Sequence, residues 1–261
     1  MLETKLFAPG TFCWTDLATT DAPAAKSFYC QLFGWEACDE PVPDGTYTML
    51  LLNGKKVGAL YQLSNDQRAQ GIPPHWLSYV ASEQVDDMAR KAKELGAELL
   101  MPPFDVMGAG RMVVVKDPTG AVFALWQAAK GHEGSEVMNG APGSVIWNEL
   151  ATKDSARSEA FYTALFGWQP NKHNITGMPY TEFLNRERPA AGMMQMTAEW
   201  GNAPPHWMVY FAVTDCEAIT RRARELGGTV IVEPTTLPEV GSFAILQDPQ
   251  GAVFSIMKPI S

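Results

Sequence analysis

An internal repeat constrains this chain more than any other sequence feature. The segment FYCQLFGW at residues 28–35 recurs as FYTALFGW at 161–168, PPHW at 73–76 recurs at 204–207, and DPTGAVF at 117–123 recurs as DPQGAVF at 248–254. The matched segments are 161 − 28 = 133 residues apart early in the repeat and 204 − 73 = 131 residues apart later, so only loop lengths differ. The repeat indicates one domain duplicated in tandem. We expect domains at 1–128 and 142–261, joined by a polar, glycine-bearing linker at 129–141.

Each copy is predicted to contain two β-α-β-β-β units. In the first unit, residues 11–19 alternate as a half-buried strand does, Asp21 is placed to cap a helix, and Gly34 is placed to end it. Strands are expected next at 35–38, 46–52 and 56–63. The second unit repeats this order, with a strand at 75–81, a helix from Val85 that ends at Gly96, and strands at 97–101, 111–116 and 121–127. Asp154 and Asp215 are the matching helix caps of the second copy.

Composition limits the classes of function. The chain has 261 residues, of which 46% are hydrophobic, and a formal net charge of −9. No apolar run approaches the roughly 20 residues that cross a bilayer, and the first residues lack the apolar core of a signal peptide, so we expect a cytoplasmic protein without a membrane partner. The net charge argues against nucleic acid, which requires clustered Lys and Arg. The four cysteines are too few and too irregularly spaced for a disulfide framework, and we expect free thiols.

These motifs resemble those of the vicinal oxygen chelate superfamily, which contains glyoxalase I, the extradiol dioxygenases, and the fosfomycin and bleomycin resistance proteins. The resemblance covers nearly the whole chain and is carried by the paired units, FYxxLFGW, and the closing DPxGxxF hairpin. WxDLxTxD at 14–21 and PPHW are similar to two-domain members labelled glyoxalase-like, hydroxylase-like or culture-filtrate antigen-like. The resemblance implies an α+β fold of tandem duplicated domains, in which each pair of units forms an open curved sheet, or cup, around a small molecule.

The resemblance also implies where a metal ligand would stand, and this chain departs from that pattern. Metal-using members place His or Gln seven residues before the Asp that starts the helix, and Trp14 and Trp147 occupy this position here. An indole offers an N–H donor and no lone pair to a metal. The Glu of the last strand corresponds to Ala124 and Ser255, and the ligand of the second unit corresponds to Leu77 and Met208, although Gln195 could still reach a metal. We therefore predict no metal site and no other cofactor.

Alternate residues of a strand share a face, which predicts the side chains that line each cup. Both copies place a Trp, a carboxylate, a His and a Tyr on the cup face. We assign acid–base roles to the polar members, and ligand contacts to the indoles and to Met208. The acid–base residues are Asp16, His75 and Tyr79 in the first copy and Glu149, His206 and Tyr210 in the second, and the indoles are those of Trp14 and Trp147.

An architectural interpretation of the same residues stays open. A carboxylate beside a His can tune its pKa, and a Tyr can donate to a developing oxyanion. Alternatively, Asp16 and Glu149 pair with an Arg or with loop amides, and each PPHW motif fixes the entry to a strand, with its His bonded to a backbone carbonyl. Arg111 follows the loop at 102–110 and is a candidate for binding an anionic ligand, whereas Ser242 stands at the matching place after the loop at 233–241. These loops are expected to be connectors at the cup mouth, or else lids.

The sequence is compatible with three functions. We favour a metal-independent small-molecule-binding protein of the sequestering or resistance type. The alternative is a glyoxalase-like lyase or hydrolase that acts on a small carbonyl compound through His and carboxylate chemistry. The third is an interaction protein with vestigial cups. The sequence is compatible with a monomer or a homodimer, because paired units already complete each cup within the chain.

Overall fold

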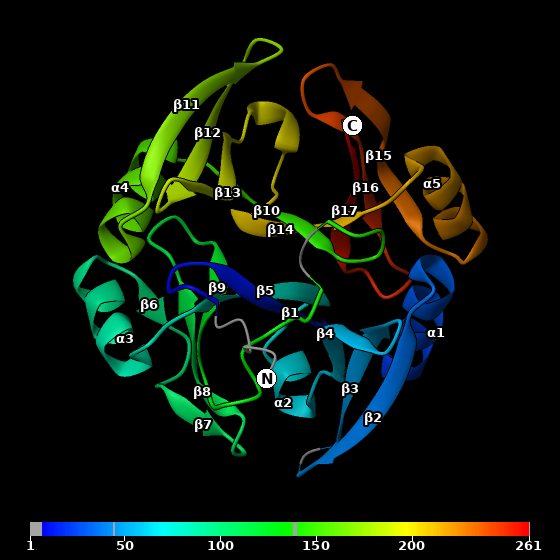
Figure 1. Cartoon of the computed structure of the whole chain (residues 1–261), viewed down its shortest axis with the longest axis horizontal. Helices are drawn as coiled ribbons and strands as arrows, with labels where there is room; N and C mark the ends of the chain where they lie inside the picture. The colour runs from blue at the N-terminus through cyan, green and yellow to red at the C-terminus, as the bar shows by residue number, and fades with distance from the viewer. Residues whose placement is uncertain (1–6, 44, 138–139, 261) are drawn as a thin grey trace, which may run out of the picture. The chain divides into compact units, whose positions relative to one another are not determined.

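A computed structural model describes residues 7–43, 45–137 and 140–260 (Figure 1). The first repeat contains the two predicted β-α-β-β-β units. Its first unit comprises β1 (Phe12–Thr19), α1 (Ala22–Phe33), β2 (Glu36–Val42), β3 (Gly45–Leu52) and β4 (Lys55–Gln62), and a short helix, α2 (Asn65–Ala69), follows. Its second unit comprises β5 (His75–Ala81), α3 (Val85–Glu94), β6 (Glu98–Leu99), β7 (Phe104–Val106), β8 (Gly110–Lys116) and β9 (Val122–Ala128).

The second repeat has the same plan. Its first unit comprises β10 (Val145–Thr152), α4 (Ser155–Phe166), β11 (Gln169–Ile175), β12 (Met178–Asn185) and β13 (Arg188–Gln195), and the short helix η1 (Ala198–Trp200) follows. Its second unit comprises β14 (His206–Ala212), α5 (Cys216–Glu225), β15 (Thr229–Leu237), β16 (Gly241–Gln247) and β17 (Val253–Pro259). The predicted fold class is confirmed. Helix α2 was not predicted, and the prediction of loops throughout 102–110 and 233–241 is wrong, because β7 and the end of β15 lie there.

Each repeat forms one mixed sheet. The strand order is β2-β3-β4-β1-β5-β9-β8-β6 in the first, with β7 also paired to β8, and β11-β12-β13-β10-β14-β17-β16-β15 in the second. The inner pairs β1–β4 and β5–β9 are parallel, as are β10–β13 and β14–β17, while the hairpins outside them are antiparallel. The same residue pattern thus produces the same sheet twice.

The helices begin and end where the sequence predicts. The Asp21 carboxylate accepts a hydrogen bond from the Ala24 amide at 3.0 Å and caps α1, and the Asp154 carboxylate accepts one from the Arg157 amide at the start of α4. Gly34 ends α1 at φ 70°, and Gly167 ends α4 at φ 73°. A left-handed backbone conformation costs little free energy only for glycine, which explains the Phe-Gly-Trp motif.

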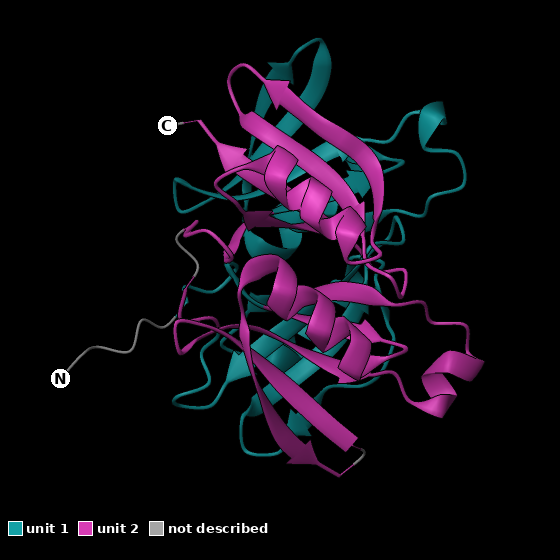
Figure 2. Cartoon of the chain, turned by 90° about the vertical axis from the view of Figure 1, so that its right-hand side faces the viewer, with its two compact units in different colours: residues 1–14, 78–134, 148–207 teal, residues 15–77, 135–147, 208–261 magenta. Residues whose placement is uncertain are grey.

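Two compact units combine segments of both repeats (Figure 2). Unit 1 lies within the ranges 1–14, 78–134 and 148–207, and unit 2 lies within 15–77, 135–147 and 208–261. In the core of unit 2, Phe28, Tyr29 and Leu32 of α1 belong to one buried cluster with Phe211 and Phe254 of the second repeat. The apolar face of α1 is therefore covered in part by residues from the other copy of the repeat.

A buried hydrogen-bond chain recurs in each unit and links FYxxLFGW of one repeat to DPxG of the other. In unit 2, the Trp76 indole donates to the Tyr29 hydroxyl at 3.0 Å, which donates to Asp248 at 3.0 Å. In unit 1, Trp207 donates to Tyr162 at 2.9 Å, and Tyr162 donates to Asp117 at 2.8 Å. Burial of the Tyr29 hydroxyl, followed by the charge of Asp248, raises the pKa of Tyr29. Tyr29 therefore remains a donor.

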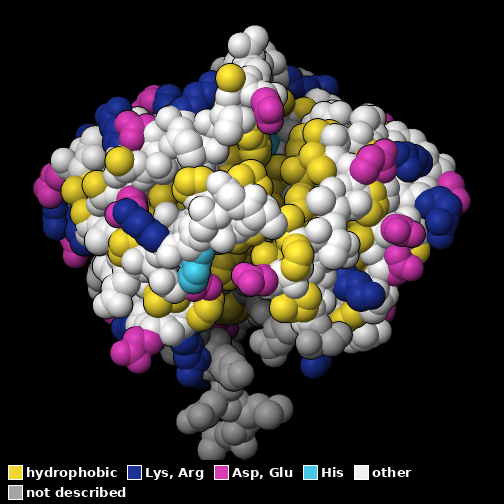
Figure 3. All heavy atoms as spheres, turned by 90° about the horizontal axis from the view of Figure 1, so that it is seen from above, with side chains coloured by type: hydrophobic (Ala, Val, Ile, Leu, Met, Phe, Trp, Pro, Cys, Tyr) yellow, Lys and Arg dark blue, Asp and Glu magenta, His cyan; other side chains and the backbone are white. Residues whose placement is uncertain are grey.

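The state of the cysteines and the distribution of surface charge agree with what the composition predicts. All four cysteines are free: Cys13 and Cys216 are buried, Cys30 is half-buried, and Cys38 of β2 is exposed opposite Met49 of β3. On the face drawn in Figure 3, Lys and Arg side chains are interspersed with Asp and Glu instead of forming one basic patch. No helix among the described residues is long and apolar enough to span a membrane.

Candidate ligand-binding site

The site in the first repeat is built around Asp16, which is only 2% exposed. Asp16 of β1 lies opposite Ala59 of β4, and Ala59 lies opposite Met49 of β3. Tyr47, two residues before Met49 on the same face, donates its hydroxyl hydrogen to Asp16 Oδ2 at 3.0 Å. The small side chain of Ala59 leaves room for Tyr47 to cross β4, so a buried carboxylate obtains the donor that burial requires.

A second tyrosine completes this cluster. Tyr61 of β4 is paired in register with Tyr47, and the two rings are stacked with centroids 6.3 Å apart and planes inclined by 23°. Burial and then the charge of Asp16 raise the pKa of Tyr61, while a hydrogen bond from the Gln67 side chain opposes this shift. The Tyr61 hydroxyl is therefore protonated at neutral pH and is a hydrogen-bond donor.

Both PPHW histidines have the same backbone contact. His75 Nδ1 lies 2.8 Å from the Pro73 carbonyl oxygen, and His206 Nδ1 lies 2.8 Å from the Pro204 carbonyl oxygen. A carbonyl only accepts, so Nδ1 carries the hydrogen and, in the neutral ring, Nε2 has a lone pair. Burial lowers the pKa of both imidazoles, against the opposing effect of the carbonyl contact. This contact is the one that the architectural interpretation predicts, and it also leaves Nε2 as a base.

The corresponding face of the second repeat has different chemistry. Glu149 of β10 lies opposite Gly192 of β13, which lies opposite Glu182 of β12, so a glycine separates two carboxylates in register. Glu182 Oε2 accepts a hydrogen bond from the Asn171 amide at 3.3 Å and lies 3.5 Å from His173 Nε2. Tyr180 takes the place of Tyr47, but Met194 takes the place of Tyr61. The second face therefore lacks the second hydroxyl.

The other predicted residues fall in both compact units. Tyr79 and Tyr210 are buried opposite Ala124 and Ser255, respectively. Trp14 and Trp147 are half-buried, whereas Met208 is buried. The residues predicted for the first copy are divided between the units: Asp16 and His75 belong to unit 2, and Trp14 and Tyr79 belong to unit 1. The residues predicted for the second copy are divided in the same way: Glu149 and His206 belong to unit 1, and Trp147, Met208 and Tyr210 belong to unit 2.

Arg111 is engaged elsewhere. Its guanidinium donates to both oxygens of Asp86 in α3, at 2.7 and 2.8 Å, and to Asp105 at 3.0 Å. It also donates to the Pro103 carbonyl oxygen at 3.3 Å. These contacts tie β7 and β8 to α3, and the binding of an anionic ligand by Arg111 stays a prediction. A guanidinium whose charge is balanced by two carboxylates is a poor site for an anionic ligand.

Gln195 likewise has a structural partner. Its Oε1 accepts the Ser155 amide at 3.0 Å at the start of α4, and its Nε2 donates to the Lys153 carbonyl at 2.7 Å. Gln62 makes the same contacts with Ala22 and Thr20 at α1.

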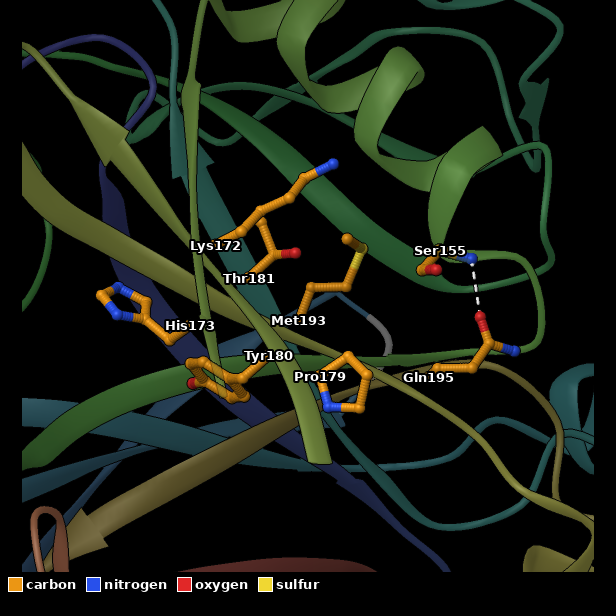
Figure 4. Close-up of a pocket in the computed structure, with 8 residues that line it drawn as sticks. All are labelled: Ser155, Lys172, His173, Pro179, Tyr180, Thr181, Met193 and Gln195. Atoms are coloured by element: carbon orange, nitrogen blue, oxygen red, sulfur yellow. Dashed lines mark hydrogen bonds between the residues drawn. The ribbon is translucent and has the colours of Figure 1, made fainter. Parts of the chain in front are cut away.

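Gln195 also borders a pocket of about 80 Å³ (Figure 4). Typical small-molecule pockets have volumes of roughly 300 Å³ or more, so this one is too small to enclose a ligand of that size. The pocket is lined by Ser155, Lys172, His173, Pro179, Tyr180, Thr181, Met193 and Gln195.

The residues present do not fit a divalent ion. Ala124 and Ser255, at the positions where the resemblance implies a carboxylate, are fully buried and cannot supply a charged oxygen ligand. Across the described ranges 7–43, 45–137 and 140–260, no group of three or more His, Cys, Asp or Glu side chains could hold a metal ion. The described side chains of the site offer aromatic rings, carboxylates, hydroxyls and imidazoles.

Sequence reasoning missed Tyr47, Tyr61, Gln67 and Glu182. One signal was present, because the Tyr-Thr pair at 47–48 recurs at 180–181 within a predicted strand, and its tyrosines fall on the cup face. Tyr61, Gln67 and Glu182 have no such counterpart. A comparison of the two repeats alone cannot find residues in which the repeats differ.

Comparisons with known proteins agree with this architecture. The family described as the Glyoxalase/Bleomycin resistance protein/Dioxygenase superfamily matches the chain twice, at residues 11–125 and 144–256. The "Putative glyoxylase CFP32" of Mycobacterium tuberculosis (strain CDC 1551 / Oshkosh) is 42% identical over 256 residues, covering 97% of this chain and 96% of that protein. The "Anthracycline biosynthesis protein DnrV" of Streptomyces peucetius is 40% identical over 266 residues, covering 97% of this chain and 94% of that protein.

Solved structures share the fold at low sequence identity. The Mn(II)-bound glyoxalase from Novosphingobium aromaticivorans has a TM-score of 0.65 and 16% identity, covering 97% of this chain and 83% of that chain. The 2,3-dioxygenase LapB from Pseudomonas sp. KL28 has a TM-score of 0.64 and 12% identity, covering 98% of this chain and 94% of that chain. At these identities the likeness concerns the fold alone.

Proposed function

Because this chain belongs to the Glyoxalase/Bleomycin resistance protein/Dioxygenase superfamily, we propose that it binds a planar, oxygen-bearing small molecule without a metal ion held by the protein. The observation that carries this proposal is the cluster of Asp16, Tyr47 and Tyr61 on one sheet face. Stacked phenol rings offer apolar area to a planar ligand, and the hydroxyl and carboxylate groups beside them recognise its polar substituents.

Two further observations support a planar ligand. One relative carries the name of an anthracycline biosynthesis protein, and anthracyclines are polycyclic aromatic compounds that carry hydroxyl and carbonyl groups. In this chain, the position at which metal-using relatives place a chelating side chain is an indole in both repeats, Trp14 and Trp147. An indole contributes a flat apolar wall and one N–H donor, which suits the same class of molecule.

A second candidate function is proton transfer on a small carbonyl compound, in keeping with the relative named as a glyoxylase. His75 and His206 favour it, since each holds its hydrogen on Nδ1 against a backbone carbonyl and leaves Nε2 to accept a proton from a substrate. The Tyr61 hydroxyl is a donor that would stabilise negative charge on a carbonyl oxygen. In this reaction the imidazole takes the proton of a carbon next to the carbonyl and returns it to the product.

The test is a binding titration with hydroxylated anthraquinones, followed by tryptophan fluorescence. We expect binding that survives dialysis against a chelator, and a loss of affinity of about tenfold or more in Asp16→Asn and Tyr47→Phe, because the first removes the charge of the buried carboxylate and the second removes the hydroxyl that donates to it. In the second repeat, Glu149→Gln and His206→Ala are expected to weaken binding to that copy.

Asp39→Asn is the matched control for Asp16→Asn. Asp39 lies on the same sheet but pairs with Lys26 of α1 at 2.8 Å, on the face that the helix covers. We expect it to leave affinity unchanged. Loss of binding on chelation, together with a stoichiometric divalent ion in the purified protein, would contradict the proposal, as would equal affinities of Asp16→Asn and wild type.

A further inference from the structure

The two repeats differ at the position of Tyr61, although the residues paired with it in register match. Tyr61 is paired with Ala18 of β1 and with Tyr47 of β3, and its counterpart Met194 is paired with Ala151 of β10 and with Tyr180 of β12. The neighbours are an alanine and a tyrosine in both repeats. A hydroxyl donor in the first repeat is thus replaced by a thioether, which donates no hydrogen bond.

The Tyr61 phenol is placed to act as a donor. Its ring stacks on that of Tyr47, with centroids 6.3 Å apart, and the two residues are paired in register. Burial and then the charge of Asp16 raise the pKa of Tyr61, so its hydroxyl keeps its hydrogen at neutral pH and can donate it.

We propose that Tyr61 donates a hydrogen bond to a carbonyl oxygen of an aromatic ligand in the first repeat, and that the second repeat, with Met194, prefers ligands without that carbonyl. This inference rests on the proposed function and adds a ligand class to it: aromatic ketones and quinones. Tyr61 is only half-buried, on the sheet face that also carries Asp16 and Tyr47.

The experiment uses two probes that differ only in the carbonyl group, 9-fluorenone and its parent hydrocarbon fluorene. The full-length protein and the variants Tyr61→Phe and Asp39→Asn are titrated with each probe, and the carbonyl stretching band of bound fluorenone is recorded by infrared difference spectroscopy. A hydrogen bond to the carbonyl lowers the frequency of this band, which a purely structural role of Tyr61 does not do.

We expect Tyr61→Phe to weaken fluorenone binding about tenfold, to leave fluorene binding unchanged and to abolish the infrared shift. The control Asp39→Asn, on the face that α1 covers, should change neither the shift nor the affinity for fluorenone. Equal losses for both probes in Tyr61→Phe, or an unshifted band in the wild type, would overturn the inference while the proposed function stands. The same holds if the wild type binds hydroxylated anthraquinones but neither of these probes. Thermal unfolding by circular dichroism confirms that each variant is folded.

Discussion

At the scale of single residues, the two PPHW histidines couple the stability of the protein to pH. Burial lowers the pKa of His75 and His206 below their ordinary value of 6.5, so the folded state binds a proton less readily than the unfolded chain. Their contribution to stability is present above pH 6.5 and is lost as pH falls through the lower pKa of the folded state. Acid in this range therefore favours unfolding.

We expect the free energy of unfolding to fall below pH 6.5, by at most about 1.4 kcal/mol per pH unit for each imidazole. The double variant His75→Gln, His206→Gln should show a shallower dependence in urea denaturation between pH 5 and pH 7. Identical slopes in the double variant and the wild type would show that these histidines are not the cause.

Sequence patterns predict residues whose role is local and miss those whose partners depend on strand register. The caps Asp21 and Gly34 follow from local chemistry. Tyr47 and Tyr61 do not, because a β-bulge between Leu50 and Leu51 shifts the β3–β4 pairing by one residue. Counting back from the Asn53-Gly54 turn would place Tyr47 opposite Leu60, on the wrong face. The same bulge recurs between Phe183 and Leu184.

At the scale of elements, one glycine ends a helix and another begins a strand, and the two differ in the space around them. Gly34, after α1, has φ 70° and open space around the position of a Cβ atom. Gly241, at the start of β16, has φ 124°, and a Cβ atom there would overlap the Lys258 carbonyl oxygen of β17. Only the second glycine is required by both its backbone conformation and its neighbour.

Gly34→Ala should therefore lower the free energy of unfolding by about 1–2 kcal/mol, the cost of a left-handed alanine. Gly241→Ala should cost more than about 3 kcal/mol, because β17 must also move. Urea denaturation of the two variants measures both values, and Gly34→Ala is the control for backbone strain alone. Equal costs would mean that β17 accommodates the methyl group freely.

The edge strands show where element prediction fails. Residues 233–241 contain two prolines and a glycine, which favour a loop, yet β15 continues to Leu237 and pairs with β16 across register shifts. An edge strand tolerates proline because one side of its backbone has no partner strand. Pairing with β16 thus outweighs the preference of proline and glycine for a loop at this edge of the sheet.

At the scale of the whole molecule, the repeats that the sequence defines differ from the units that bury a core. The Tyr29–Asp248 and Tyr162–Asp117 hydrogen bonds each join residues of different repeats within one compact unit. The domain limits at 1–128 and 142–261 describe the repeat and stay a prediction. A repeat expressed alone would expose the apolar face of its first helix, α1 or α4, whose partners come from the other copy.

We therefore expect fragments 1–128 and 142–261 to show no cooperative unfolding transition separately, and to form a one-to-one complex with a cooperative transition when they are co-expressed. Size-exclusion chromatography and circular dichroism measure both properties. Tyr29→Phe in the first fragment removes the donor to Asp248 and serves as a graded control that should weaken the complex. A fragment 1–128 that unfolds cooperatively by itself would contradict this expectation.

The differing surroundings of the four thiols have a practical consequence. Burial raises the pKa of Cys13, Cys30 and Cys216 and so suppresses their thiolate forms, which are the reactive ones. Cys38 is exposed, and its pairing with Met49 puts it on the sheet face that also carries Tyr47. A maleimide dye will therefore attach at one native position beside the aromatic cluster, and its emission can report on occupancy without any engineered cysteine.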